Sequence, residues 1–262
     1  MKTIVFDLDG TLTISKDALD EEMTALLGKL LASCNVAIIS GASWKQVHKQ
    51  IGSLLNINTT ALNNLYILPA SGGSMYQSWG KYGWVAAYQN KLSPRDVDRI
   101  SAAFEEAIAE SGFEQPQKLW GKQFENCDSK ITFSALGQKA PLSAKEKWDS
   151  DGMKRRTLAD VLYRKLQTYE VRIAGKTSID VSAKGINKKY GIDELMKKLR
   201  ASKDDILYVG DAIFKGGSDY AAIEMGLIYV QVRDPEDTKT WIRNTLDSAN
   251  QIEQSNIKIN EG

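Results

Sequence analysis

Short runs of aliphatic and β-branched residues alternate with stretches of helical periodicity in the N-terminal part of this 262-residue chain. Apolar residues recur at helical spacing over Asp20–Ala32 and Trp44–Leu55. The intervening runs are expected to be strands, at Lys2–Phe6, Val36–Ile39 and Leu65–Leu68. Strands that are apolar on both faces are typical of a parallel sheet covered by helices on each side. This part of the chain therefore predicts an α/β fold.

The same pattern returns after Lys188. The expected elements are helix Ile192–Leu199, strand Ile206–Val209, helix Asp219–Met225, strand Ile228–Val232 and helix Thr238–Ser248. The polar tail from Ala249 to Gly262 is expected to be loosely ordered.

The middle of the chain has a different pattern of apolar and polar residues. Alternating segments at Lys130–Ser134 and Thr177–Val181 lie among amphipathic helices expected at Pro94–Ser111 and Met153–Thr168. This mixture is typical of an α+β module with an antiparallel sheet. We therefore predict a Rossmann-like core with a mainly parallel sheet, built from residues 1–82 and 185–262. An α+β cap of residues 83–184 is inserted into it.

Charge and cysteine content exclude several classes of protein. The chain carries 34 Lys and Arg against 33 Asp and Glu, so its net charge of +1 predicts neither a nucleic-acid partner nor a membrane partner. It lacks the basic and apolar regions of a signal peptide, and no apolar run reaches about 18 residues. A cytoplasmic protein is expected. Cys34 and Cys127 lie far apart without CxxC spacing, which indicates neither a disulfide framework nor a zinc site.

Acidic side chains follow two of the expected core strands. Asp7 and Asp9 come directly after the first strand, and Asp211 follows the strand at Ile206–Val209. Ligands bind outside the carboxyl ends of the strands in open parallel sheets, so these side chains are expected to converge. Carboxylates gathered in one place repel one another unless a cation lies between them, and Mg²⁺ prefers oxygen ligands. The pattern predicts a Mg²⁺ site.

A phosphate-binding site is expected beside the metal. Ser40 and the backbone amides near Gly41 follow the second strand and can donate to phosphoryl oxygens. Lys188 can offset the phosphate charge, although Lys184 and Lys189 are close competitors for this role. Taken alone, Ser40 is also interpreted as a helix N-cap, a geometry compatible with phosphate binding.

These residues resemble a known family. The sequence Asp7-Leu-Asp9-Gly-Thr11 is similar to the DxDGT signature of the haloacid dehalogenase-like phosphohydrolases. Ser40, Lys188 and Gly210-Asp211 with Asp219 resemble the remaining three motifs of that superfamily, in order. The position of the insertion resembles the subclass with a large α/β cap of the Cof type.

The resemblance implies specific roles. Asp7 is the nucleophile that forms an aspartyl phosphate, and Asp9 is the general acid and base. Mg²⁺ is held by Asp7, by Asp211 and by the backbone carbonyl of Asp9. Thr11 and Asp219 orient this metal site without binding the ion themselves. Asp219 is equally interpreted as the N-cap of the helix that follows it.

A closer similarity is to the eukaryotic-type phosphomannomutases. Residues 175–181, 185–190 and 210–219 resemble the corresponding segments of those enzymes, so Ser178 and Asp180 of the cap are expected to contact a sugar phosphate. Phosphomannomutases hold the distal phosphate with cap arginines, and Cys127 and Gln138 stand where two of these are expected. A thiol or an amide does not replace a guanidinium fork.

The leading hypothesis is therefore a Mg²⁺-dependent phosphatase that acts on a small-molecule phosphate ester, such as a sugar phosphate. A phosphomannomutase-like phosphohexomutase is the alternative. A non-enzymatic receiver-like module is disfavoured by the size of the insertion and by the second aspartate. A homodimer formed through the cap is left open.

Overall fold

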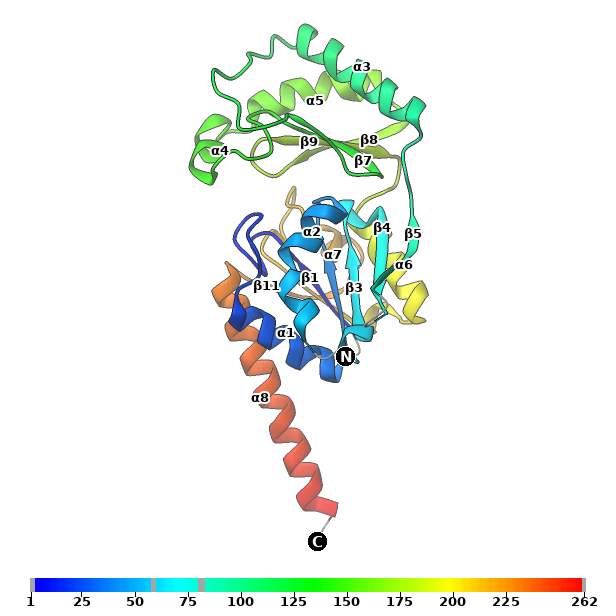
Figure 1. The fold of residues 1–262 in the computed structure, drawn as a ribbon, viewed down its shortest axis with the longest axis vertical. Coiled ribbons are helices and arrows are strands. Elements are labelled where there is room, and N and C mark those ends of the chain that lie inside the picture. The colour runs from blue at the N-terminus through cyan, green and yellow to red at the C-terminus, as the bar shows by residue number, and fades with distance from the viewer. Residues whose placement is uncertain (1–2, 58–59, 80–82, 261–262) are drawn as a thin grey trace.

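The computed structural model describes residues 3–57, 60–79 and 83–260, and it contains two sheets (Figure 1). The strands of the larger sheet are β1 (Thr3–Asp7), β2 (Asn35–Ile39), β3 (Leu65–Leu68), β4 (Ser74–Ser78), β5 (Trp84–Gln89), β10 (Ile206–Gly210) and β11 (Ile228–Gln231). Their order across the sheet is β11-β10-β1-β2-β3-β4-β5. The pairings from β11 to β3 are parallel, and β4 and β5 add an antiparallel edge.

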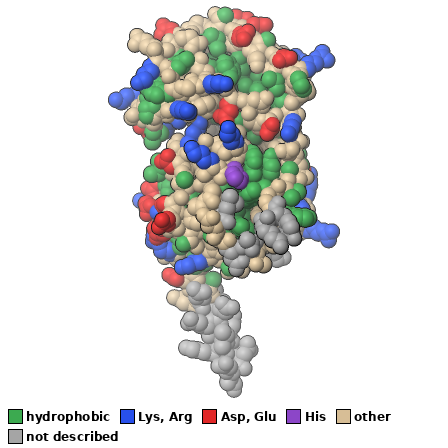
Figure 2. Space-filling view, in the orientation of Figure 1, with side chains coloured by type: hydrophobic (Ala, Val, Ile, Leu, Met, Phe, Trp, Pro, Cys, Tyr) green, Lys and Arg blue, Asp and Glu red, His purple; other side chains and the backbone are tan. Residues whose placement is uncertain are grey.

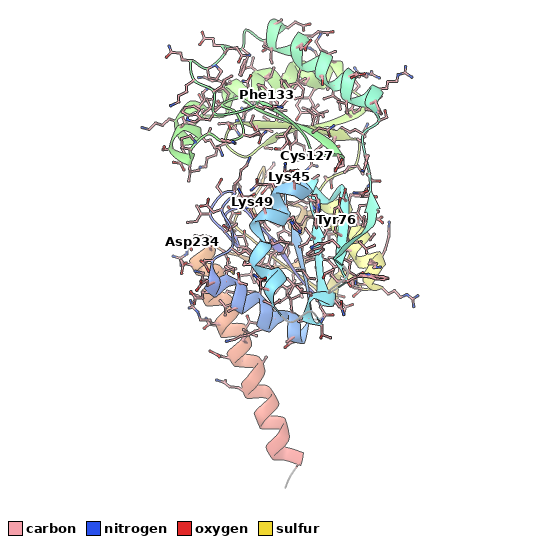
Figure 3. All side chains as sticks on the ribbon, in the orientation of Figure 1. Lys45, Lys49, Tyr76, Cys127, Phe133 and Asp234 are labelled. Atoms are coloured by element: carbon pink, nitrogen blue, oxygen red, sulfur yellow. The ribbon has the colours of Figure 1, made fainter. Side chains whose placement is uncertain are left out.

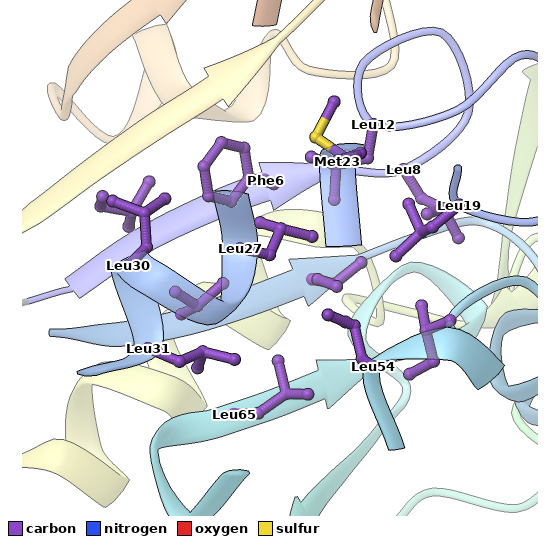
Figure 4. Close-up of a cluster of buried hydrophobic side chains, with 14 of the residues drawn as sticks. Phe6, Leu8, Leu12, Leu19, Met23, Leu27, Leu30, Leu31, Leu54 and Leu65 are labelled. Atoms are coloured by element: carbon purple, nitrogen blue, oxygen red, sulfur yellow. The ribbon is translucent and has the colours of Figure 1, made fainter. Parts of the chain in front are cut away.

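Helices cover both faces of this sheet. They are α1 (Glu21–Ser33), α2 (Trp44–Gln50), α6 (Lys188–Leu199), α7 (Ala221–Glu224) and α8 (Pro235–Asn260), with short 3-10 turns at Gly52–Asn56, Ala61–Asn64, Ala70–Gly72 and Lys203–Asp205. On one face, Phe6 of β1 packs with the apolar side of α1 (Figure 4). Ile4 of β1 and Ile242 of α8 belong to the same buried cluster. On the other face, Val5 packs in the cluster that contains Ile192 of α6. Both faces are buried, which is why the strand sequences are continuously apolar.

The second sheet is antiparallel. Its strands are β6 (Phe124–Asn126), β7 (Lys130–Ser134), β8 (Tyr169–Ala174) and β9 (Ser178–Ala183), in the order β6-β7-β9-β8. Its helices are α3 (Pro94–Glu110), α4 (Leu142–Trp148) and α5 (Met153–Lys165). Apolar side chains of β7 and β9 pack with α3 and α5 on one face. The other face is turned toward the larger sheet (Figure 1).

The observed architecture is the expected α/β core with a mainly parallel sheet and an inserted α+β segment, so the predicted fold class is confirmed. The predicted boundary at residue 82 lies outside the described residues. Strand β5 nevertheless pairs with β4, so the larger sheet continues to Gln89 and includes residues that the sequence assigned to the cap. As an edge strand, β5 is exposed along most of its length, although Trp84–Tyr88 is a continuous apolar run like those of the central strands.

Three helix ends differ by four residues or more from the sequence prediction. Helix α6 begins at Lys188, four residues earlier than expected, because the side chain of Asn187 caps it by accepting from the amide of Tyr190 at 3.1 Å. Helix α2 ends at Gln50. Helix α8 continues through the polar tail to Asn260, where a loosely ordered segment was expected. None of the helices in the described ranges is long and apolar enough to cross a membrane.

Candidate active site

The carboxyl ends of β1, β2 and β10 lie side by side in the larger sheet. Asp7 is the last residue of β1, Asp211 follows β10, and parallel pairing places both strands in register. Oxygen atoms of Asp7, Asp211 and Asp219 all lie within 4.8 Å of one another. The structure therefore brings together two carboxylates separated by more than 200 positions in the sequence, and it adds Asp219 to them.

The turn after β1 fits tightly around Asp211. Gly10 has a φ of +98°, and a Cβ atom at this position would lie 2.6 Å from Oδ2 of Asp211. Only glycine tolerates both the positive φ and the close approach of the Asp211 carboxylate. The buried hydroxyl of Thr11 lies 3.5 Å from Oδ2 of Asp7 and 3.3 Å from Oδ1 of Asp211, so it links the two carboxylates.

Lys188 is buried beside the carboxylates. As the first residue of α6 it reaches back to the sheet, where its ammonium donates to Asp7, to Asp219 at 2.6 Å and to the hydroxyl of Tyr208 at 3.3 Å. A close approach of two glycines lets α6 come this near, since a Cβ atom on Gly72 would lie 2.5 Å from the Cα of Gly191. Lys188, and neither of its competitors, therefore occupies the site.

Burial dominates the protonation of the cluster. It raises the pKa of Asp7 to about 8, against the opposing charge of Lys188. Burial also raises the pKa of Asp211, with a contribution from the negative charge of Asp219. For Lys188, burial acts to lower the pKa, but the charges of Asp219 and Asp7 outweigh it and hold the pKa well above its usual value. One lysine thus faces three carboxylates, which leaves the centre short of positive charge.

Asp219 is more than a helix cap. Helix α7 begins at Ala221, and the carboxylate of Asp219 instead accepts from Lys188, from the hydroxyl of Tyr208 at 2.7 Å and from the amide of Ala212 at 3.1 Å. Burial opposes ionisation, but the charge of Lys188 and these hydrogen bonds lower its pKa. Asp219 therefore fixes Lys188 and the loop after β10.

Asp9 lies apart from the three clustered carboxylates. Its Oδ1 accepts from the backbone amide of Lys16 at 2.6 Å and from Nε2 of Gln50 at 2.9 Å. Gln50 is buried at the end of α2, and the sequence analysis did not select it. The helical spacing of α2 gave no signal that its last residue returns to the active site.

Ser40 and Gly41 form a tight turn rather than a helix start. Ser40 is buried, and its Oγ accepts from the amide of Ala42 at 3.1 Å, while α2 begins later, after Ser43. The interpretation of Ser40 as a helix N-cap is therefore wrong. The carbonyl of Ser40 accepts from the amide of Ser71 at 2.8 Å, which joins this turn to the turn after β3. Ser71 adopts a left-handed backbone with a φ of 59°.

The second sheet presents polar side chains to the site. Period-two alternation places Thr132 of β7 and Asp180 of β9 opposite each other, on the face without helices. Oδ1 of Asp180 accepts from the hydroxyl of Thr132 at 2.7 Å, and Oδ2 forms an ion pair with Lys130. The hydroxyl of Ser178 lies 2.9 Å from that of Ser134. Ser178 and Asp180 therefore share one face, with the carboxylate already paired.

Several contacts join this face to the larger sheet. Lys16, which follows Asp9, donates from Nζ to the carbonyl and the side-chain oxygen of Gln138 at 3.2 and 3.0 Å. Ser43 donates to Glu125 at 2.8 Å. Lysine and arginine side chains gather where the two parts meet (Figure 2). Cys127 lies on the side of the second sheet that is closer to the larger sheet (Figure 3). Burial raises the pKa of its thiol to about 12.

The fold and the site together define an α/β enzyme with an inserted cap. The sequence pattern of the haloacid dehalogenase-like hydrolases matches residues 4–213, and the chain belongs to this family. The family expected from the motifs is therefore confirmed.

Comparison with individual proteins adds detail. The chain is 26% identical to the phosphomannomutase of Schizosaccharomyces pombe over 245 residues, which cover 90% of this chain and 91% of that protein. Its fold resembles the IMP-bound IMP-nucleotidase of Plasmodium falciparum with a TM-score of 0.69 and 18% identity, over 93% of this chain and 67% of that one. A haloacid dehalogenase-like hydrolase from Bacteroides thetaiotaomicron gives a TM-score of 0.61 and 15% identity, over 93% and 99% of the respective chains. The two structural likenesses concern the fold alone.

Proposed function

We propose that this protein is a Mg²⁺-dependent phosphohydrolase that acts on a small phosphate ester through an aspartyl phosphate on Asp7. The observation that carries the proposal is the meeting of Asp7, Asp211 and Lys188 at the carboxyl edge of the parallel sheet. The membership of the chain in a hydrolase family supports it.

The residues at this edge fit a Mg²⁺ ion. Hard divalent cations prefer carboxylate oxygens, and three lie within 4.8 Å of one another with a single lysine to balance them. Asp7 and Asp211 would hold the ion together with the backbone carbonyl of Asp9, because the oxygens of Asp219 already accept from Lys188, Tyr208 and Ala212. When bound, Mg²⁺ supplies charge neutralisation for a phosphoryl group.

The two N-terminal aspartates divide the chemistry between them. A carboxylate oxygen of Asp7 attacks phosphorus, the bond from phosphorus to the ester oxygen breaks, and Asp9 gives its proton to the leaving oxygen. Asp9 then takes a proton from water, which attacks the aspartyl phosphate and releases inorganic phosphate. The amide of Lys16 and the side chain of Gln50 hold Oδ1 of Asp9 during both steps. Ser40 and Gly41 bind the phosphoryl oxygens, and Lys188 orients Asp7.

A sugar phosphate is the proposed substrate, since curated relatives over most of the chain are named phosphomannomutase. The same relatives make a phosphohexomutase the second candidate. Against it stand Cys127 and Gln138, where arginines are expected to hold a distal phosphate. The Cys127 thiol is buried with a raised pKa, and the Gln138 side chain accepts from Lys16. Transfer to water is therefore preferred.

Two assays test the proposal. Purified protein with Mg²⁺ is expected to release phosphate from a panel of phosphate esters, and Asp7→Asn is expected to remove this activity. No release across the panel, or full activity in Asp7→Asn, would refute the mechanism. A coupled assay for conversion of mannose 1-phosphate to mannose 6-phosphate, with a bisphosphate activator, tests the mutase alternative. Turnover in that assay would favour the mutase.

A further inference from the structure

We propose that Lys130 is a phosphate-binding residue that the cap supplies to the active site; this inference rests on the function proposed above. Lys130 is the first residue of β7, and its side chain is only 3% exposed. Its neighbour Ile131 packs with the helices of the cap, so the alternation of a strand turns Lys130 toward the larger sheet. There it forms an ion pair with Asp180.

The ammonium of Lys130 reaches the phosphate-binding turn of the core. A Cβ atom on Gly41 would lie 3.6 Å from Nζ of Lys130 and 3.8 Å from Oγ of Ser71. Three segments that are remote in sequence therefore converge on one point beside Ser40. A side chain at position 41 would occupy the space in front of both donors, whereas glycine leaves it open.

The position of Lys130 is fixed by its neighbours in the chain. Ser129 packs so closely on Gly73 that a Cβ atom there would overlap its hydroxyl. The carbonyl of Asp128 accepts from the amide of Leu92 at 2.7 Å, and the carbonyl of Lys130 accepts from the amide of Cys127 at 2.9 Å. The turn that precedes β7 is thus docked on the core, which holds the ammonium in place.

Hydrogen-bond capacity distinguishes Lys130 from Lys188, the two buried lysines beside the candidate site. An ammonium has three N–H donors. Those of Lys188 have three acceptors, on Asp7, Asp219 and Tyr208. In the described part of the chain, the ammonium of Lys130 is bonded to Asp180, which leaves two donors for oxygens of a phosphoryl group beside Ser40. Lys130 therefore supplies what Lys188, already committed to carboxylates, does not.

A consequence for the enzyme is that phosphate binding depends on the cap. The turn at Ser40 belongs to the core and Lys130 to the inserted segment, so the full set of donors exists only when the two are in contact. Asp180 then acts through Lys130, because it holds the ammonium that meets the substrate.

Binding of inorganic phosphate to the whole protein, measured by calorimetry in the presence of Mg²⁺, tests this inference. Lys130→Met is expected to weaken phosphate binding by about tenfold to a hundredfold, the usual worth of a hydrogen bond to a charged group. Lys176→Met is the matched control, because Lys176 is a cap lysine that is half exposed and paired with Glu146. It is expected to bind phosphate like the wild type.

A double variant separates binding from structural support. If Lys130 only neutralises Asp180, then Lys130→Met combined with Asp180→Asn removes both charges and restores the affinity for phosphate. If Lys130 binds phosphate, the double variant stays as weak as the single one. The double variant leaves no unpaired charge buried, so it also carries the test if the single variant is unstable. Restored affinity, or unchanged affinity in Lys130→Met, overturns the inference; a wild type that binds no phosphate overturns the proposed function as well.

Discussion

Asp7→Asn is expected to make the metal-free protein more stable while it removes activity. Asparagine has nearly the same shape as aspartate and can still accept a hydrogen bond from Lys188. It carries no charge into the buried cluster, where one lysine faces three carboxylates. The proposed nucleophile is thus expected to lower the stability of the fold.

The magnitude follows from the pKa of Asp7, which burial raises from 3.8 to about 8. Because the folded-state pKa lies above the unfolded value, the folded protein retains a proton that the unfolded chain has released, and stability falls as pH rises from about 4 to about 8. At pH 7 this linkage costs roughly 4 kcal/mol. The pKa of about 8 already includes the attraction of Lys188, and asparagine still accepts a hydrogen bond from this lysine, so Asp7→Asn is expected to gain up to about 4 kcal/mol.

Thermal unfolding at several pH values, in the presence of a chelator, measures the effect. At pH 7 to 8 the melting temperature of Asp7→Asn is expected to exceed that of the wild type by roughly 5 to 10 °C, and the difference is expected to shrink toward pH 5. Asp9→Asn is the matched control, since Asp9 lies outside the three clustered carboxylates. A less stable Asp7→Asn, or a gain that does not change with pH, would refute the reasoning.

Three further predictions concern other residues. Asp9→Ala is expected to abolish phosphate release with an unchanged far-ultraviolet circular dichroism spectrum, and a normal rate would contradict its role as acid and base. Lys188→Met leaves Asp7 and Asp219 without their cation and is expected to lower the free energy of unfolding in urea by about 3 to 5 kcal/mol; a loss below about 1 kcal/mol would count against this. Burial raises the pKa of Cys127 to about 12, so this thiol is expected to resist iodoacetamide at pH 8 until urea unfolds the protein, and rapid labelling of the native protein would contradict its buried position.

The sequence was sufficient for the parts of the site that lie at strand ends. Asp7, Ser40 and Asp211 each follow an apolar run, and parallel strands bring their carboxyl ends to one edge of the sheet. Lys188 was separable from Lys184 and Lys189 only by motif spacing. The structure adds the physical reason. The side chain of Asn187 caps the N-terminus of α6, so the helix begins at Lys188.

Contacts across the tertiary structure lay beyond the sequence. Gln50 is the last residue of a helix, and only the packing of α2 shows that its side chain meets Asp9. The pair of Lys130 and Asp180 depends on the register of β7 and β9. Strand β5 belongs to the larger sheet through its pairing with β4, and its short apolar run, Trp84–Tyr88, does not by itself show which sheet it joins.

The central claim is that Asp7 becomes covalently phosphorylated during turnover. The most direct test mixes the enzyme with a phosphate ester that it hydrolyses and quenches the reaction rapidly with acid. Peptide mass spectrometry then locates any added phosphoryl group. The account predicts one added phosphoryl group on the peptide that contains Asp7, placed on Asp7 by fragmentation and absent from Asp7→Asn. Turnover without this adduct, or an adduct on Asp9 or on another side chain, would contradict it.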